Sequence, residues 1–428
     1  MTQSRRAHAI LVAAVAVFAA TYLALDLNRL YALRYGADLG TFLQMGVNLW
    51  HGSSWNGAEW RPHFQVHDSW VLAPIALPLA LFPKAQTLLV IQVLAVACAA
   101  FALFRFARTA GNTAADSCML GIAYLLSPAT QGLAYDNFSE NVFVPPAAFW
   151  GAIAVRRRAL VPALLAAQCL LGLKEDEALF ITWFGVACAL WWDRRIGLWL
   201  TALALANGLA FAIAERVAGV QPSIPAYGFQ IHDPSGKVSL ILLLLAPFAF
   251  TPLALGRRLL LSLPLLAEID LAKPWAFEIS RIGSHWAAPL LAATSLAAAL
   301  GMRSWPRAAK ALVPCALIVG IFFSDTVLKP GRWPYVIDWQ QYARAAGLRE
   351  SSREVIVPRE YEGVWAVAAV NPVVRLSRQS HDIGIKCPAY DRDARAFFAS
   401  LRFGAAAAAP LCQGVPVPPG SATPLPFP

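Results

Sequence analysis

Apolar stretches recur along most of the chain and are separated by short polar turns. Many approach the length of an α-helix that crosses a bilayer, which is roughly 20 apolar residues. The sequence therefore predicts an all-α polytopic membrane protein with about 11 transmembrane helices. The candidate spans are residues 9–25, 87–104, 118–134, 142–155, 159–173, 178–192, 196–214, 238–255, 259–271, 286–300 and 311–327.

Two apolar segments have a second interpretation. The first run follows Arg5 and Arg6, as a signal peptide would, but it is long for one and no small-residue cleavage site follows it. We therefore interpret it as a first membrane anchor. Residues 70–83 contain Pro74 and Pro78 within a short apolar run, which is too short for a comfortable crossing and favours a re-entrant or interfacial segment.

The composition excludes a soluble enzyme. Hydrophobic residues make up 58% of the chain and charged residues only 14%, whereas ordinary soluble domains are about 25% charged. No single soluble core of this length would bury that much apolar surface. The seven cysteines, 27 glycines and 30 prolines also do not form the patterns of a disulfide scaffold or a collagen.

The net charge of +10 is explained by membrane topology. Basic clusters such as Arg156-Arg157-Arg158 and Arg194-Arg195 lie at the ends of apolar spans, in alternate loops. Lys and Arg favour cytoplasmic loops, so the N-terminus is expected inside, in a multi-pass protein of the inner (plasma) membrane. A nucleic-acid patch is the alternative, but the clusters are short and dispersed, and we expect no nucleic-acid partner.

The predicted domains follow from this topology. Residues 1–328 form the transmembrane domain, in which residues 35–69 are the first external loop. Residues 329–412 are polar and mixed and predict a small extracytoplasmic α/β appendage, with a helix at 339–346 and strand-like segments at 354–358 and 364–376. Residues 413–428 form a Pro-rich tail that is predicted to be disordered. Cys387 and Cys412, both within residues 329–412, could form a disulfide in an oxidising compartment.

The polar residues with functional chemistry all lie on the outer side in this topology. A group of acidic and histidine residues at one membrane face suggests one shared polar site. Its candidate members are Asp38, His63, His67, Asp136, Glu140, Lys174, Glu175, Asp176, His232, Asp233 and His285.

Asp38 is the candidate general base. The apolar residues that follow it recur with helical spacing up to Trp50 and predict an amphipathic helix lying flat on the outer surface. At the N-terminus of that helix, Asp38 could simply cap backbone N–H groups. Its other role would be to deprotonate an acceptor hydroxyl at the lipid–water boundary.

Two further groups could bind a substrate or an ion. His63 and His67 are four residues apart and are weak candidates for a divalent-metal site, although hydrogen bonding to substrate or to a neighbouring loop is favoured. Lys174 begins a charged turn with Glu175 and Asp176, which is either a solvated turn or a point charge for a lipid phosphate. Lys273 and Arg281 could add positive charge there.

Taken together, these motifs resemble the DUF2079 membrane-protein family, which is similar to the GT-C glycosyltransferases. The resemblance covers about residues 35 to 300 and, more loosely, the tail. In place of the usual Asp-Phe-His-x-Glu of the family, this chain has Asp136-Asn137-Phe138-Ser139-Glu140 and lacks the histidine. The motifs are Asp38-Leu39-Gly40-x-Phe42-x-Gln44, Asn48-Leu49-Trp50-His51-Gly52, His63-Phe64-x-x-His67, Lys174-Glu175-Asp176 and Ser284-His285-x-x-x-Pro289.

The resemblance implies an enzyme that uses a polyprenyl-phosphate-linked sugar donor and acts on the extracytoplasmic side. Asp38 matches the position of the catalytic base, and Lys174 is placed similarly to a lysine that contacts the donor phosphate. The acceptor would be a glycan, lipid or protein. The alternatives are a transporter or flippase of lipid-linked sugars, and a non-catalytic membrane scaffold. Transporters place ionisable residues near the membrane midplane, whereas here they lie at span ends.

Overall fold

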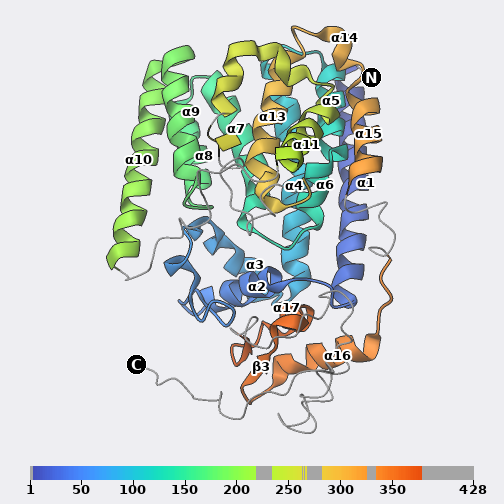
Figure 1. Cartoon of the computed structure of the whole chain (residues 1–428), viewed down its shortest axis with the longest axis vertical. Helices are drawn as coiled ribbons and strands as arrows, with labels where there is room; N and C mark the ends of the chain where they lie inside the picture. Colours follow the sequence, from blue (N-terminus) through green and yellow to red (C-terminus); the bar gives the residue numbers. More distant parts are fainter. Residues whose placement is uncertain are drawn as a thin grey trace.

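The computed structural model of the chain describes residues 3–217, 234–262, 264, 266–267, 282–324 and 334–377. These residues are mostly helical. Figure 1 shows the apolar helices in one half of the molecule, with α2, α3, α16 and α17 gathered at the other end. Several predictions concern positions outside the described residues: those for His232, Asp233, Lys273, Arg281, Cys387, Cys412 and the Pro-rich tail.

Three helices are long and apolar enough to cross a membrane: α1 (Gln3–Tyr31), α4 (Ala85–Thr109) and the segment Arg194–Ala214 of α10 (Arg194–Val217). The other predicted spans form shorter helices in the described chain, so membrane association is supported but the count of about 11 spans is not confirmed. These shorter helices are α5 (Ala114–Leu126), α6 (Pro128–Tyr135), α7 (Val144–Arg156), α8 (Leu160–Leu171), α9 (Glu177–Trp191), α11 (Pro234–Leu245), α13 (Ala288–Gly301) and α15 (Leu312–Phe323). The short helix α14 (Pro306–Ala309) lies between two predicted spans.

Local backbone chemistry divides two of the predicted spans. The 118–134 run breaks at Ser127, whose side chain accepts the Thr130 N–H and begins α6, with Pro128 in its first turn. The 238–255 run is α-helical only as far as Leu245, and the chain turns again at Ala249 and Phe250, whose φ values are 47° and 56°. It continues in the 3-10 helices η5 (Ala246–Phe248) and η6 (Thr251–Ser262).

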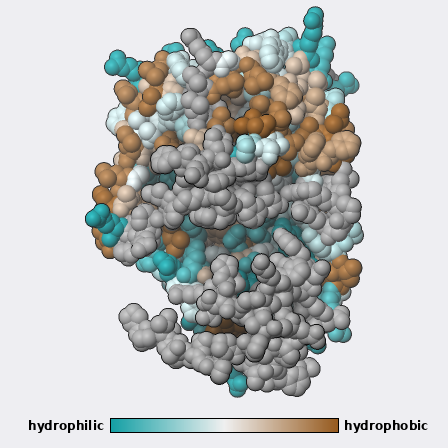
Figure 2. All heavy atoms as spheres, viewed as in Figure 1, coloured by the Kyte–Doolittle hydropathy of each residue, from teal (hydrophilic) through white to brown (hydrophobic). Residues whose placement is uncertain are grey.

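Helix α4 lies at the centre of the bundle and packs against α1, α5 and α7. It has small buried residues such as Ala97 and Ala100, which allow helices to approach closely in a membrane. The outer pair α9 and α10 instead exposes large apolar side chains, including Leu190 and Leu209. Figure 2 shows such side chains concentrated over the helical half of the molecule. An exposed apolar surface of this kind fits contact with lipid.

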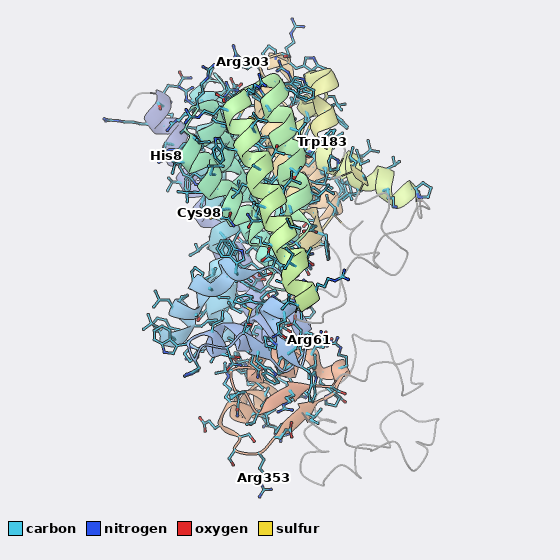
Figure 3. The ribbon with its side chains drawn as sticks, turned by 90° about the vertical axis from the view of Figure 1, so that its left-hand side faces the viewer. His8, Arg61, Cys98, Trp183, Arg303 and Arg353 are labelled. Carbon is cyan, nitrogen blue, oxygen red and sulfur yellow. The ribbon has the colours of Figure 1, made fainter. Side chains whose placement is uncertain are left out.

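Basic residues from three separate loops meet at one end of the bundle. Arg156 donates to the carbonyl of Thr109 at 3.3 Å, and Arg303 donates to that of Ala110 at 3.2 Å. Arg108 closes the same turn by donating to Asn112. Figure 3 shows Arg303 at the opposite end of the molecule from Arg61 and Arg353. The basic loops therefore cluster at one end, as the charge pattern predicts.

The opposite end combines two parts of the chain. The first consists of α2 (Ala37–Leu49), the antiparallel strands β1 (Trp55–Asn56) and β2 (Arg61–Pro62), and the helices η1 (His63–Gln65), η2 (Trp70–Ile75) and α3 (Ala76–Leu81). The second consists of α16 (Trp339–Gly347), η9 (Leu348–Glu350), η10 (Arg359–Tyr361), α17 (Glu362–Ala368) and the parallel strands β3 (Val355–Val357) and β4 (Val374–Leu376).

The appendage differs from its prediction in one element. The helix at 339–346 and the strand at 354–358 are present as α16 and β3. Residues 364–376 are not strand throughout, because most of their first half belongs to helix α17, which is buried from Gly363 to Ala368. This helix packs on α2, where the indole N–H of Trp365 donates to the carbonyl of Ala37 at 3.0 Å.

Helix α2 forms where the amphipathic helix is predicted, but it does not lie flat on a surface. All eight residues from Leu39 to Gly46 are buried. Gly40 faces the ring of Trp365 in α17, and Gly46 faces Leu79 in α3, so the helix is packed on two sides. Trp50, just beyond its end, is 59% exposed. The helix therefore joins the bundle to the appendage.

Candidate functional site

Asp38 lies in the first turn of α2 but is not its N-cap. The N-cap is Gly36, which has no side chain to make a cap hydrogen bond. The Gly36 N–H instead donates to the side-chain oxygen of Asn137 at 2.9 Å, and the Ala37 N–H donates to Glu362 at 3.1 Å. Asp38 therefore does not occupy the N-cap position, and Asn137 and Glu362 accept the N–H groups of the two residues before it.

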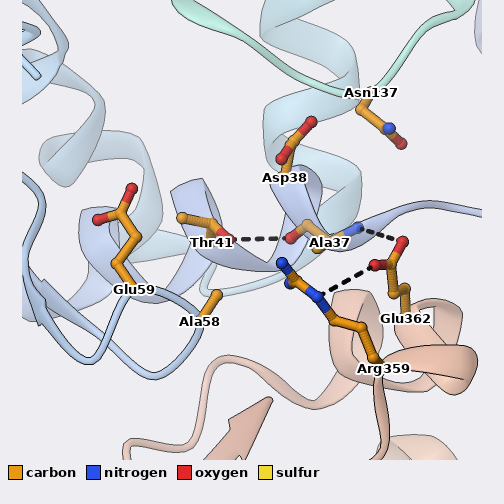
Figure 4. Close-up of a pocket in the computed structure, with 8 residues that line it drawn as sticks. All are labelled: Ala37, Asp38, Thr41, Ala58, Glu59, Asn137, Arg359 and Glu362. Atoms are coloured by element: carbon orange, nitrogen blue, oxygen red, sulfur yellow. Dashed lines mark hydrogen bonds and ion pairs between the residues drawn. The ribbon is translucent and has the colours of Figure 1, made fainter. Parts of the chain in front are cut away.

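The carboxylate of Asp38 lines a cavity of about 330 Å³, a volume within the range of small-molecule sites. Its walls come from α2, from the β1–β2 turn, from the loop after α6 and from the C-terminal appendage, as Figure 4 shows. The lining is mainly polar and includes three carboxylates and one guanidinium group. The lining residues are Ala37, Asp38, Thr41, Ala58, Glu59, Asn137, Arg359 and Glu362.

Asp136 and His285 form a paired group next to Asp38. The Nδ1 of His285 lies 3.0 Å from Oδ2 of Asp136, which also accepts the backbone N–H of His285 at 3.1 Å. Burial raises the pKa of Asp136, but the hydrogen bond and charge of His285, with Arg29 nearby, outweigh it and leave the pKa lowered. Burial lowers the pKa of His285, but Asp136, with a smaller contribution from Asp38, leaves it raised. Both groups therefore favour their charged forms.

Lys174 lies within electrostatic range of His285. Its ammonium is 3.0 Å from the centre of the Trp286 ring, which is a cation–π contact. Lys174 is only 7% exposed, and within the part of the chain that the structure describes its ammonium makes no hydrogen bond or ion pair. Its charge also acts on His285 and His67. Glu175 is also within electrostatic range of this ammonium, but an ammonium that makes no hydrogen bond retains its capacity to bind an anion.

Glu175 pairs with His67, and Glu140 lies within electrostatic range of the same imidazole. The Nδ1 of His67 is 3.2 Å from Oε1 of Glu175. Burial lowers the pKa of His67, but the hydrogen bond and charge of Glu175 outweigh burial and leave this pKa raised. Burial raises the pKa of Glu175, but the hydrogen bond and charge of His67 outweigh it and leave that pKa lowered. Burial and the charge of Glu175 raise the pKa of Asp68 to about 7.

His63 completes a third carboxylate–histidine pair, with Glu59 at 2.9 Å. Burial raises the pKa of Glu59, but the hydrogen bond and charge of His63 leave it lowered. His63 and His67 do lie together, with ring centres 5.3 Å apart, yet each directs Nδ1 toward a different carboxylate. No group of three or more His, Cys, Asp or Glu residues within the described ranges could hold a metal ion.

The structure thus brings most of the predicted outer-face residues to one end of the bundle. Asp176 is the N-cap residue of α9 (Glu177–Trp191), and no side-chain cap bond is formed there. The sequence reasoning missed Glu59, Asn137, Arg359 and Glu362. Glu59 could have been found from its spacing of four residues before His63, whereas Arg359 and Glu362 gave no local signal because they reach the cavity only through the docking of the appendage.

Comparison with known proteins agrees with the motifs. Residues 29–231 match the family described as "Predicted membrane protein (DUF2079)". The matched segment contains Asp38, both loop histidines, Asp136 and Lys174. Nothing matches the chain among curated proteins or among solved structures. Over residues 29–231 the chain is a match to the DUF2079 family of predicted membrane proteins, which confirms the resemblance expected from its motifs.

Proposed function

We propose that this protein is an integral membrane glycosyltransferase of GT-C type. It transfers a sugar from a polyprenyl-phosphate-linked donor to an extracytoplasmic glycan, lipid or protein. The observation that carries the proposal is the position of Asp38. Its carboxylate lines a polar cavity at the end of an apolar helical bundle, within electrostatic range of His285 and close to the lysine-bearing turn.

Asp38 is the general base in this mechanism. It accepts the proton of an acceptor hydroxyl while that oxygen forms a bond to C1 of the donor sugar, and the bond from C1 to the phosphate oxygen breaks. The displacement inverts the configuration at C1. The bond electrons leave with the polyprenyl phosphate, whose added negative charge needs a cation close by.

Lys174 supplies that cation. The Trp286 ring and the surrounding burial hold its ammonium in place, and within the described residues it forms no salt bridge, although Glu175 lies within electrostatic range. The Asp136–His285 pair lies nearby, and His285 is held by two contacts to one oxygen of Asp136, one from its backbone N–H and one from Nδ1. Such preorganised charges stabilise a leaving group better than mobile water does.

The proposed orientation follows from the basic loops. These loops meet at the end of the bundle opposite the cavity. If they lie in the cytoplasm, the site opens on the extracytoplasmic side of the inner (plasma) membrane, where a lipid-linked donor reaches it from the bilayer.

The test compares Asp38→Asn with a matched control, Asp116→Asn. Asp116 also lies in the first turn of a helix, α5, but at the basic end of the bundle. Purified full-length variants in lipid nanodiscs are given radiolabelled polyprenyl-phosphate sugars and a membrane extract as the source of acceptors. We expect Asp38→Asn to lower transfer about 10²–10⁴-fold, the usual contribution of general base catalysis, and Asp116→Asn to leave it unchanged. Transfer that survives Asp38→Asn would remove Asp38 as the base.

Lys174→Met tests the second role. Methionine keeps the length and apolar stem of the side chain but lacks its charge. We expect a fall in transfer that is larger for poorer phosphate leaving groups, because the charge acts on the departing oxygen. Movement of the labelled lipid between leaflets without any transfer would instead indicate a flippase.

A further inference from the structure

Three arginines from different parts of the chain gather around the turn that follows α4. Arg156, the last residue of α7, donates to the carbonyl of Thr109 at 3.3 Å. Arg303, between α13 and α14, donates to the carbonyl of Ala110 at 3.2 Å, and Arg108 closes the same turn from α4 itself. The carbonyl end of a helix attracts cations. It holds these three guanidinium groups close to one another.

The three guanidinium groups keep most of their hydrogen-bonding capacity. Each has five N–H donors and uses one nitrogen on a backbone carbonyl, and all three side chains are exposed. Within the described ranges, none of the three makes an ion pair. Asp116, in the first turn of α5, instead accepts the Thr113 hydroxyl at 2.6 Å. The cluster is therefore a group of positive charges without a bound anion of its own.

This cluster lies at the depth of the lipid headgroups. Helix α4 has 25 residues, whereas about 20 cross the hydrocarbon of a bilayer, so the turn after its end lies at the membrane boundary. Arg105, one helical turn earlier, lies over the ring of Trp150, with Cζ 5.5 Å from the ring centre. Trp150 is 46% exposed, and exposed tryptophans favour the membrane–water interface.

We infer that Arg108, Arg156 and Arg303 bind the phosphate of an anionic membrane phospholipid. The planar fork of an arginine matches phosphate oxygens with paired hydrogen bonds. Three cations exceed the single charge of one phosphodiester, so the cluster repels the ammonium of a zwitterionic headgroup and favours a lipid with net negative charge. The inference goes beyond the proposed function and does not depend on it, because Arg303 lies at the end of the molecule opposite the cavity (Figure 3).

Native mass spectrometry of the full-length protein, titrated with lipid in a neutral detergent, tests the inference. The probes are phosphatidylglycerol and phosphatidylcholine, which share the phosphate but differ in net charge. We expect phosphatidylglycerol to bind more tightly. The double variant Arg156→Gln/Arg303→Gln should bind it about 25-fold more weakly, or about fivefold for each arginine. The two single variants repeat the test if the pair does not fold, and Arg156→Lys/Arg303→Lys should keep only part of the affinity.

Arg194→Gln/Arg195→Gln is the matched control. It removes the same charge from two exposed arginines, but these begin α10, which packs on α9 and α8. Binding of phosphatidylglycerol should be unchanged in this variant. The inference is overturned if the control weakens binding as much as Arg156→Gln/Arg303→Gln does, if the latter binds as tightly as the wild type, or if the two lipids bind equally. Displacement of the lipid by an equal concentration of inorganic phosphate would assign the cluster to a free anion and would also overturn it.

Discussion

Gly40→Ala should weaken the docking of the appendage, although alanine is the better helix former. Gly40 lies within α2, where replacing glycine by alanine ordinarily stabilises by about 0.5–1 kcal/mol. A Cβ at this position would lie 2.4 Å from Nε1 and 2.5 Å from Cδ1 of Trp365. The Trp365 ring is rigid and fully buried, so it cannot move aside without displacing α17.

The size of the effect follows from these opposing contributions. Overpacking a filled core costs about 1–3 kcal/mol, which exceeds the helix gain and leaves a net cost of about 1–2 kcal/mol. A local opening that is easier by this amount is about tenfold more populated. Trypsin cleavage within residues 334–377 follows this population when opening is fast relative to cleavage, so we expect cleavage to become about tenfold faster.

Gly46→Ala is the control in the same helix. Its Cβ would meet Cδ1 of Leu79 at 2.3 Å, which is the end of a flexible side chain in α3 and not part of the appendage. Cleavage of residues 334–377 should therefore keep its wild-type rate. If Gly40→Ala is cleaved no faster than the wild type, Trp365 is not seated against α2 and the appendage does not form the cavity wall.

Three further outcomes are expected. Asp136 raises the pKa of His285 above 6.5. The stability that this pair contributes is therefore complete below pH 6.5 and is lost as the pH rises through the pKa of His285 in the folded protein. The melting temperatures of the wild type and of His285→Asn should converge between pH 6 and pH 9, and a constant gap would contradict the pairing. The Gln44 amide donates to the carbonyls of Asn371 and Val374, at 2.8 and 3.1 Å. Gln44→Leu should therefore destabilise the protein by about 1–3 kcal/mol for each buried partner left unpaired. A melting temperature unchanged from the wild type would refute this prediction. In a cysteine-free background, a membrane-impermeant thiol reagent should label Arg353→Cys in intact cells but not Arg157→Cys, and labelling of both would overturn the proposed topology.

Much of the fold follows from local sequence. Hydropathy predicts the helical half of the molecule, and loop charges predict that Arg108, Arg156 and Arg303 lie at one end, where the structure places them. The helix limits were less predictable. A serine followed by a proline split one span at Ser127, and positive φ values at Ala249 ended another, because hydropathy does not report on backbone conformation.

Candidate site residues were also recognisable, since histidines and carboxylates beside apolar spans are unusual. The partners of these residues could not be recognised from the sequence. Asp136 meets His285 across 149 positions of sequence, and His67 meets Glu175 across 108. Nothing near either residue in the chain indicates which carboxylate will approach which imidazole. The role of α2 was likewise hidden, because its apolar positions are equally compatible with lipid on one side or protein on two.

The sequence by itself determined that this protein is a helical membrane protein with its basic loops at one end, and that its motifs resemble the DUF2079 family, which residues 29–231 match. These properties depend on the solvation free energy of each segment, which is set by local composition. Only the tertiary structure decided that a tail residue, Arg359, would share a cavity with Asp38 of the first loop. That proximity results from the packing of Trp365 against Gly40, more than 300 positions away in the chain, and long-range packing depends on the shape of both surfaces together.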